Sequence, residues 1–158
     1  MRYDTAVADQ VTEELRLIRQ NVPGVRGSIT ATRDGLLLAH DVHGLEPTQI
    51  AALVAATHAV AVRASLSTEC GQLKEVITRG TDGYLAVYTA GAAAIVAVLG
   101  TSELNVAMLN FKARPMIERI AEQSADLARG PRADPAAPGP DDGGAAGGEP
   151  LPARRDEE

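Results

Sequence analysis

Cysteine and aromatic residues are scarce in this 158-residue chain. It has one cysteine, one phenylalanine and no tryptophan, and aromatic residues make up only 3% of the sequence. A single cysteine cannot form an intramolecular disulfide or a thiolate cluster for zinc, which favours a reducing compartment. So few aromatic side chains leave almost no stacking platforms for single-stranded nucleic acid. These absences favour a cytoplasmic protein that holds no structural zinc and binds no nucleic acid.

Positive charge and long apolar runs are also in short supply. The formal net charge is -6, which argues against binding to a phosphate backbone. The first twenty residues are charged throughout and lack the apolar core of a signal peptide. His58 and Arg63 interrupt the most apolar stretch, so we expect no insertion into a membrane.

Large apolar side chains are nearly missing from the last part of the chain. The segment 130–158 is mostly proline, glycine, alanine and acid, with seven acidic and three basic side chains. Such a segment buries too little apolar surface to offset the entropy lost on ordering. We therefore expect a folded domain over residues 1–129 and a disordered, solvating tail over residues 130–158.

Helical and strand-like patterns alternate along the rest of the chain. Apolar residues recur every three or four positions over residues 5–22, which predicts an amphipathic helix. Residues 25–31 alternate between apolar and polar side chains, which predicts a strand. The pairs Asp34-Gly35 and Asp82-Gly83 each predict a hairpin turn, because both residue types tolerate positive φ.

The remaining segments complete one sheet with its helices. Strands are predicted over residues 36–42, 72–80, 84–91 and 92–100, and the last is apolar on both parities, as a central strand covered on both faces would be. Helices are predicted over residues 50–66 and 102–128. The predicted class is α+β: a five-stranded antiparallel sheet with helices on both faces, in the order α-β-β-α-β-β-β-α.

The last helix has a predicted cap, a predicted break and a predicted buried stripe. Ser102 is the expected N-cap, and Pro115 should kink the helix or separate two helices. The expected buried stripe consists of Leu104, Met108, Phe111, Met116, Ile120 and Leu127.

The helix predicted over Ile50–Leu66 is apolar on two sides when drawn on a helical wheel. The sector expected to pack on the sheet contains Ile50, Leu53, Val54, Thr57, Val60, Ala61 and Ala64. A second apolar sector, built mainly of small side chains, contains Ala51, Ala55, His58, Ala59, Val62 and Leu66. A third and narrower sector, expected to face solvent, contains Gln49, Ala52, Ala56, Arg63 and Ser67.

A helix with two apolar faces needs two covers. The sheet supplies one, and the other helices are needed on the opposite face of the sheet. We expect the second apolar sector to pack against another subunit, where each large side chain contributes ~1.5–3 kcal/mol on burial. The alternative is that a terminal helix of the same chain folds over this sector.

Two segments carry a family resemblance. Residues 22–42, VPGVRGSITATRDGLLLAHDV, resemble the opening hairpin of roadblock (dynein light chain) domains, with a glycine-containing strand, an Asp-Gly turn and a leucine-rich strand. Residues 71–99, GQLKEVITRGTDGYLAVYTAGAAAIVAVL, resemble the last three strands of that family, including the Gly-Tyr that starts the fourth. The resemblance covers residues 1–128.

The resemblance implies a dimer and a partner. Roadblock domains dimerise through the central helix and the third strand, which joins two sheets edge to edge. Bacterial members are similar to gliding-motility regulators that bind a Ras-like GTPase, and many accompany such a GTPase and a sensor histidine kinase. The implied dimer positions are the second sector of the central helix together with Leu73, Glu75, Val76 and Ile77. Gln49 and Arg63 are candidate contacts to the partner protein.

No catalytic or cofactor-binding pattern emerges. The stretch His40-Asp41-Val42-His43 lacks further ligands to complete a metal site, and Cys70 has no activating neighbour evident from spacing. No P-loop or nucleophile elbow occurs, so the chain is not itself a GTPase, and we expect no enzyme activity and no cofactor. The exposed arginines that could supply an arginine finger are Arg26, Arg33, Arg63 and Arg79, and nothing selects one of them.

Three functions from different classes are compatible with these features. The first is a homodimeric adaptor that binds and regulates a small Ras-like GTPase. The second is a pure scaffold that tethers a sensor kinase or another signalling partner without affecting GTP hydrolysis. The third is a small-ligand sensor, which the low aromatic content disfavours because few groups are available to line a specific pocket.

Overall fold

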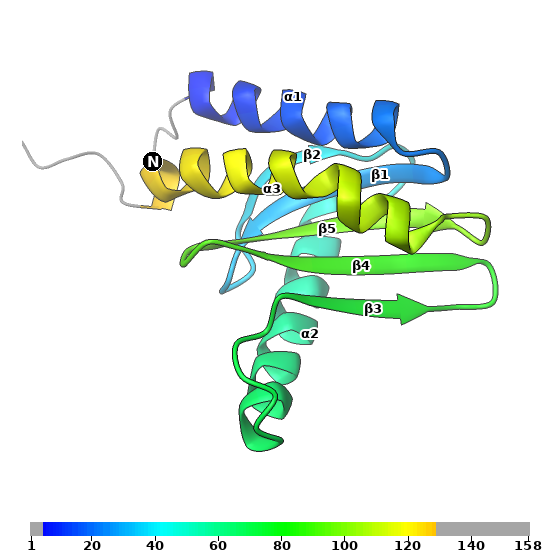
Figure 1. Cartoon of the computed structure of the whole chain (residues 1–158). Coiled ribbons are helices and arrows are strands. Elements are labelled where there is room, and N and C mark those ends of the chain that lie inside the picture. The colour runs from blue at the N-terminus through cyan, green and yellow to red at the C-terminus, as the bar shows by residue number, and fades with distance from the viewer. Residues whose placement is uncertain (1–4, 129–158) are drawn as a thin grey trace, which may run out of the picture.

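The computed structural model describes residues 5–128, and these form eight elements around one sheet (Figure 1). The predicted tail over residues 130–158 lies outside the described residues. The elements are α1 (Thr5–Asn21), β1 (Val25–Thr32), β2 (Leu37–Asp41), α2 (Pro47–Ser67), β3 (Glu75–Arg79), β4 (Gly83–Ala90), β5 (Ala94–Thr101) and α3 (Val106–Ala128).

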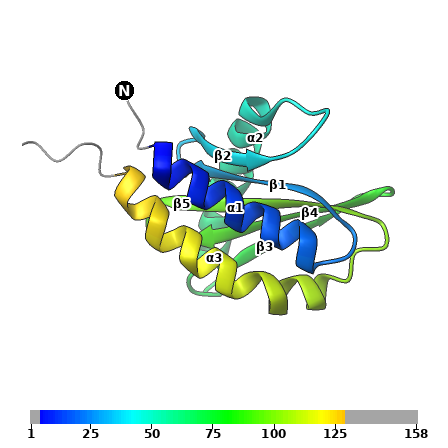
Figure 2. The same ribbon diagram turned by 90° about the horizontal axis from the view of Figure 1, so that it is seen from above.

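The five strands form a fully antiparallel sheet in the order β2-β1-β5-β4-β3. Helices α1 and α3 lie side by side on one face, and α2 crosses the other face (Figures 1 and 2). Strand β5 is central and is buried along most of its length, as its run of apolar residues predicted. The predicted fold class and element order are confirmed.

The layer of α1 and α3 is a close-packed apolar core. Val11, Leu15 and Ile18 of α1 are fully buried, as are Leu109 and Ile120 of α3. Because these side chains recur at three- and four-residue spacing, each helix presents one apolar stripe to the sheet and to the other helix. The first helix therefore packs as its sequence pattern predicted.

Polar contacts fix the edges of this layer. Both guanidinium nitrogens Nε and Nη2 of Arg119 donate to the carboxylate of Glu14, at 2.7 and 2.8 Å, and join α3 to α1. Arg19 Nε donates to the Asp41 carboxylate at 2.6 Å and joins α1 to β2. This carboxylate is buried, and its hydrogen bond raises the pKa of Arg19 above its ordinary value.

Helix α3 departs from its predicted cap and from part of its predicted buried stripe. Its N-cap is Asn105, whose Oδ1 accepts a hydrogen bond from the Met108 N–H at 2.9 Å, so the assignment of Ser102 was wrong. The helix continues through Pro115 as a single element. Phe111 is 81% exposed and Met108 is exposed too, so neither belongs to the buried stripe. Leu109, Ala113 and Ile117 are buried in place of Met108 and Phe111, while Leu104, Met116 and Ile120 are buried as predicted. The side chain of Leu127 lies outside the described part of the structure.

The start of β4 shows why the Gly-Tyr pair matters. A Cβ atom on Gly83 would lie 2.2 Å from the carbonyl oxygen of Gly100 on β5, a distance that no side chain can adopt. Glycine at this position lets β4 and β5 approach closely at the end of the ladder. The predicted hairpin between β3 and β4 is confirmed, but its turn lies at Thr81-Asp82 and not at Asp82-Gly83, because Gly83 already belongs to β4.

Helix α2 is longer than the sheet is wide at the place where it crosses. It packs on β1, β2, β4 and β5, and its second half extends beyond β3 (Figure 1). The chain then turns back through residues 68–74 to begin β3. The projecting half of α2 and the outer edge of β3 are thereby brought to the same side of the molecule.

Candidate interaction surface on helix α2 and strand β3

The face of α2 that packs on the sheet is built from small side chains. Ala51, Val54, Ala55 and His58 are buried against their own chain. The helical-wheel analysis of the sequence placed Ala51, Ala55 and His58 in the sector expected to contact another subunit, and this prediction was wrong. These small residues let the helix approach the β1–β2 turn, where a Cβ on Gly35 would already lie 3.3 Å from the backbone of α2.

The large side chains of α2 point away from the sheet. Leu53, Val60 and Leu66 are 62%, 69% and 61% exposed. Leu53 and Val60 had been expected on the sheet, so that prediction was also wrong. We call the exposed apolar residues Ala52, Leu53, Ala56, Ala59, Val60 and Leu66 the outer face of α2.

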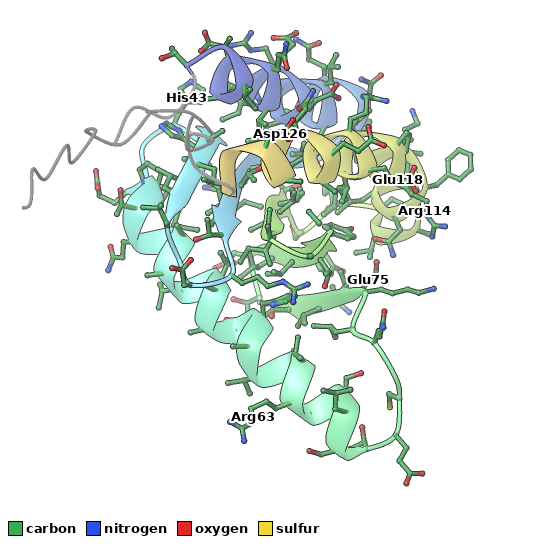
Figure 3. The ribbon with its side chains drawn as sticks, turned by 90° about the vertical axis from the view of Figure 1, so that its left-hand side faces the viewer. His43, Arg63, Glu75, Arg114, Glu118 and Asp126 are labelled. Atoms are coloured by element: carbon green, nitrogen blue, oxygen red, sulfur yellow. The ribbon has the colours of Figure 1, made fainter. Side chains whose placement is uncertain are left out.

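The remaining predicted positions on α2 surround this outer face. Gln49 and Arg63 are exposed toward its two ends, and Val62 is half-buried. Figure 3 shows Arg63 on the projecting half of the helix, with its guanidinium pointing away from the sheet. A partner bound to the outer face would therefore contact the polar side chain of Gln49 and the charged side chain of Arg63.

The outer edge of β3 is open. Within the described part of the chain, β3 pairs with β4 and with no other strand. Leu73, Glu75, Val76 and Ile77 are half-buried there. An unpaired strand edge presents free backbone donors and acceptors that another strand can satisfy. The predicted interface residues of the third strand thus lie at an accessible edge.

His58 connects three parts of this region inside one chain. Its Nε2 lies 2.9 Å from Thr89 Oγ1 on β4, and that hydroxyl donates to the carbonyl oxygen of Leu73 at 3.0 Å. Because the hydroxyl has one hydrogen and gives it to Leu73, the imidazole must be the donor in the His58–Thr89 bond. Burial lowers the pKa of His58, and the positive charge of Arg33 lowers it further.

A second polar network joins α3 to the β3 edge. Asn110 Nδ2 donates to Glu75 Oε1 at 2.8 Å, and the Tyr88 hydroxyl donates to Asn110 Oδ1. Burial raises the pKa of Tyr88, and the negative charge of Glu75 raises it further, so the phenol remains protonated. Figure 3 shows Glu75 beneath the α3 residues Arg114 and Glu118. The network aligns β3 with α3, and the sequence had suggested no link between them.

Of the side chains considered as metal ligands or nucleophiles, three are exposed and one is ion-paired. His40 and His43 are exposed, while Asp41 between them binds Arg19. Among the residues described, no three histidine, cysteine or acidic side chains come together as a metal site would require. Cys70 is exposed and contacts the Thr68 hydroxyl at 3.2 Å.

Two candidate arginines are engaged within the chain. Arg33 Nη2 donates to the Gly91 carbonyl oxygen at 2.9 Å, and the Arg79 guanidinium lies 5.8 Å from the centre of the Tyr84 ring. Arg26 is exposed on β1, on the far side of β5 from the open edge. Of the four candidates, Arg63 is the one that borders the outer face of α2.

Phe111 marks a second exposed apolar region that the sequence pattern missed. It borders an open hollow of about 830 Å³ on the outer side of α3, together with Asn21, Lys112 and Pro115. Lys112 Nζ donates to the carbonyl oxygen of Asn21 at 3.1 Å and closes one end of this hollow. The sequence contained a signal for the exposure of Phe111. Leu109 lies two positions before it and Ile117 six positions after it, and at helical spacing both residues fall on the opposite side of the helix.

One described helix, α2, is long and apolar enough by length and composition to cross a membrane, with a mean hydropathy of 1.5. Core helices of water-soluble proteins have the same property. Its inner face packs on a sheet and carries the hydrogen-bonded His58.

Comparison with known proteins agrees with this architecture. A family model described as the Roadblock/LC7 domain matches residues 11–100. The chain belongs to the Roadblock/LC7 family. No curated protein matches the sequence at a significant level. The matched segment runs from α1 to the end of β5 and so includes both α2 and the open β3 edge.

Solved roadblock structures share the fold. A Roadblock/LC7 domain from Streptomyces avermitilis is 23% identical with a TM-score of 0.66, over 72% of this chain and 97% of that one. The gliding protein MglB from Thermus thermophilus is 19% identical with a TM-score of 0.67, over 77% and 93%. MglB from Myxococcus xanthus is 10% identical with a TM-score of 0.71, over 80% and 96%. The resemblance drawn from residues 22–42 and 71–99 is confirmed at the level of family and fold.

Proposed function

We propose that this protein is a non-enzymatic, homodimeric roadblock adaptor that binds and regulates a small Ras-like GTPase in the cytoplasm. The observation that carries the proposal is the continuity of two unpartnered surfaces. The outer face of α2 exposes large aliphatic side chains, and its projecting half runs past the unpaired edge of β3. A second copy can cover both surfaces at once.

The apolar area supports association. Leu53, Val60 and Leu66 are all more than half exposed in the single chain. Burying a side chain of this size contributes roughly 1.5–3 kcal/mol, so several of them per subunit offset a substantial part of the entropy lost on association. A closed twofold arrangement uses the same surface on both copies and pairs the β3 edge of each copy with that of the other.

A second copy fits this surface better than a lipid bilayer does. The inner face of α2 is held by the sheet and by the His58–Thr89 contact, so the helix cannot enter a membrane without unfolding the domain. Arg63 also lies beside the exposed apolar residues, where a bilayer would penalise its charge. A protein partner can instead pair or solvate that charge at the rim of an interface.

The regulatory role rests on what the chain lacks and on the family it belongs to. The sequence has no P-loop, so GTP chemistry must come from a partner. Bacterial roadblock proteins of the gliding-regulator type bind a Ras-like GTPase, as the family resemblance implies. Gln49 and Arg63 are exposed beside the outer face, and we assign them to contacts with that partner. Arg63 is the candidate to reach nucleotide or a switch region.

Sedimentation of the full chain tests the dimer. We expect the wild type to sediment as a dimer at micromolar concentration and Val60→Arg to sediment as a monomer, because an arginine would be buried without a partner. Phe111→Arg is the matched control, since it makes the same chemical change on the opposite face of the sheet, and it should remain dimeric. A wild-type monomer, or equal dissociation constants for both variants, would contradict the proposal.

A turnover assay tests the regulatory role. The small Ras-like GTPases of the source organism are assayed for hydrolysis and nucleotide exchange with and without a molar excess of the dimer. We expect a changed rate with the wild type and a smaller change with Arg63→Ala. Tight binding with unchanged rates would favour the alternative of a scaffold that tethers a sensor kinase or another signalling partner. Absence of binding would reject the proposed GTPase adaptor.

A further inference from the structure

The open edge of β3 restricts how a second strand can pair with it. The N–H of Thr89 donates to the carbonyl oxygen of Lys74, and the N–H of Gly80 donates to that of Gly83. Positions 74 and 80 therefore direct their backbone groups toward β4. Because these directions alternate along an antiparallel ladder, the backbone groups of Glu75, Ile77 and Arg79 point to the open edge.

The side chains of these same three residues lie on one face. Ile77 and Tyr84 pack with the core under α1 and α3, whereas Val76 packs with the core under α2. Since side chains alternate along a strand, Glu75 and Arg79 share the face of Ile77. Contacts agree with this placement, because Glu75 binds Asn110 of α3 and Arg79 lies over Tyr84.

These facts select one arrangement for two copies of β3. An antiparallel pair must match outward-pointing residues with one another, so odd positions pair with odd positions. The arrangement that pairs all five residues of Glu75–Arg79 is centred on Ile77. Glu75 then lies opposite Arg79 of the second copy, and Arg79 lies opposite Glu75 of that copy.

Opposite charges therefore meet twice on the same face of the joined sheet. Directly opposed residues in a hydrogen-bonded antiparallel pair have Cα atoms about 5.5 Å apart, which is within reach of an arginine and a glutamate. On the other face, Val76 meets Thr78 of the second copy without any charge. The strand Glu-Val-Ile-Thr-Arg carries opposite charges at its two ends, so its charges match those of a second copy that runs in the opposite direction.

Edge-to-edge joining of two third strands is what the family resemblance implies. We infer that in this chain the two strands pair in the register centred on Ile77, and that two reciprocal Glu75–Arg79 pairs select this register. The inference rests on the proposed homodimer and adds its geometry. The register also favours homodimers over heterodimers. A third strand of another roadblock protein that lacks a glutamate and an arginine at these two positions would leave Glu75 and Arg79 of this chain without partners. The contact between Asn110 and Glu75 leaves the second carboxylate oxygen of Glu75 with no hydrogen bond to the described residues, so it remains available to an arginine.

Charge exchange tests the register directly. Glu75→Arg places two arginine–arginine pairs in its own dimer, and Arg79→Glu places two glutamate–glutamate pairs in its own. We expect each variant alone to dimerise about tenfold to a hundredfold more weakly at low ionic strength. An equimolar mixture should form a heterodimer with near wild-type affinity, since both pairs become complementary again.

Two controls guard the interpretation. Arg26→Glu makes the same charge change as Arg79→Glu on a strand away from the open edge, and it should leave the dimer unchanged. Glu75→Arg also removes the acceptor for Asn110, so thermal unfolding establishes whether that variant is folded. Should it not fold, Arg79→Glu alone remains decisive. Its dimer should tighten as salt screens the like charges, whereas the wild-type dimer should loosen.

The outcomes separate the register from the dimer. A wild-type dimer whose affinity is unchanged by Arg79→Glu, or a mixture that forms no heterodimer, would overturn the register and leave the homodimer standing. A monomeric wild type would overturn the proposed function together with the register.

Discussion

The two helical layers of this domain bury their side chains by opposite rules. In the layer of α1 and α3, large aliphatic side chains such as Leu15 and Ile120 point inward and are fully buried. In α2, Ala51, Val54, Ala55 and His58 face the sheet, while Leu53 and Val60 lie outward and exposed. The first layer is complete within one chain. In the second, large aliphatic side chains of α2 stay exposed, so its apolar surface exceeds what its own sheet covers.

The contrast teaches how to interpret an apolar helix in a small domain. An amphipathic pattern identifies the buried face when a single apolar stripe exists, as it does for α1. When a helix is apolar on all sides, the side that faces the sheet is set by how closely the helix backbone can approach the neighbouring backbone. Small side chains then face inward, because they allow α2 to lie against the β1–β2 turn at Gly35.

The largest expected effect comes from truncating matched leucines in the two layers. Leu15→Ala should lower the free energy of unfolding by about 2–5 kcal/mol, because it leaves a cavity in a close-packed core. Leu53→Ala should change it by less than about 0.5 kcal/mol when measured at concentrations where subunits are separate. Urea unfolding of both variants checks this, and similar losses would contradict the division into a complete and an incomplete layer.

A smaller effect should follow from the buried histidine of the α2 layer. The pKa of His58 is lowered in the folded chain by burial and by Arg33, so the unfolded chain binds more protons below about pH 6.5. Wild-type stability should therefore fall as the pH drops from 7.5 to 5, and the fall ends once the folded-state pKa is passed. His58→Gln should lack this component.

The measurement is the difference in unfolding free energy between wild type and His58→Gln at several pH values. Subtracting the variant removes the contribution of the carboxylates, which both proteins share. A difference that stays constant between pH 7.5 and 5 would show that His58 does not titrate differently in the two states.

The smallest effect concerns the polar link between α3 and the sheet edge. Tyr88→Phe should cost about 0.5–1.5 kcal/mol, because Asn110 loses the hydroxyl donor in a buried position. Tyr84→Phe is the matched control on the same strand, and its hydroxyl makes no hydrogen bond to the described residues. Thermal unfolding of the pair checks the difference, and an equal loss in both would argue against the Tyr88–Asn110–Glu75 network.

Much of the architecture could be predicted from local patterns. The turn at Asp34-Gly35, the hairpin between β3 and β4, the central strand β5 and the element order all follow from short-range periodicity and turn chemistry. The open β3 edge was also anticipated, through the family resemblance of residues 71–99. These features depend on neighbours within a few residues, which is the range that a sequence pattern reports.

The candidate site was predicted only in part. Ala59, Leu66, Gln49 and Arg63 are exposed as expected, whereas Ala51, Ala55 and His58 are buried within the chain. The helical wheel carried no information about which of two apolar sectors lies nearer the sheet. Phe111 was misplaced for a similar reason, since α3 has apolar residues on more than one side.

The sequence by itself determined which segments are helices and strands, where the chain turns, and that one helix has more apolar surface than a single layer needs. Only the tertiary structure decided which side of α2 faces the sheet, and only it joined His58 to Thr89 and Glu75 to Asn110 across 31 and 35 residues of chain. The physical reason is range. Periodicity records how a residue relates to its own turn or strand, whereas the direction a helix faces depends on how closely two backbones can approach.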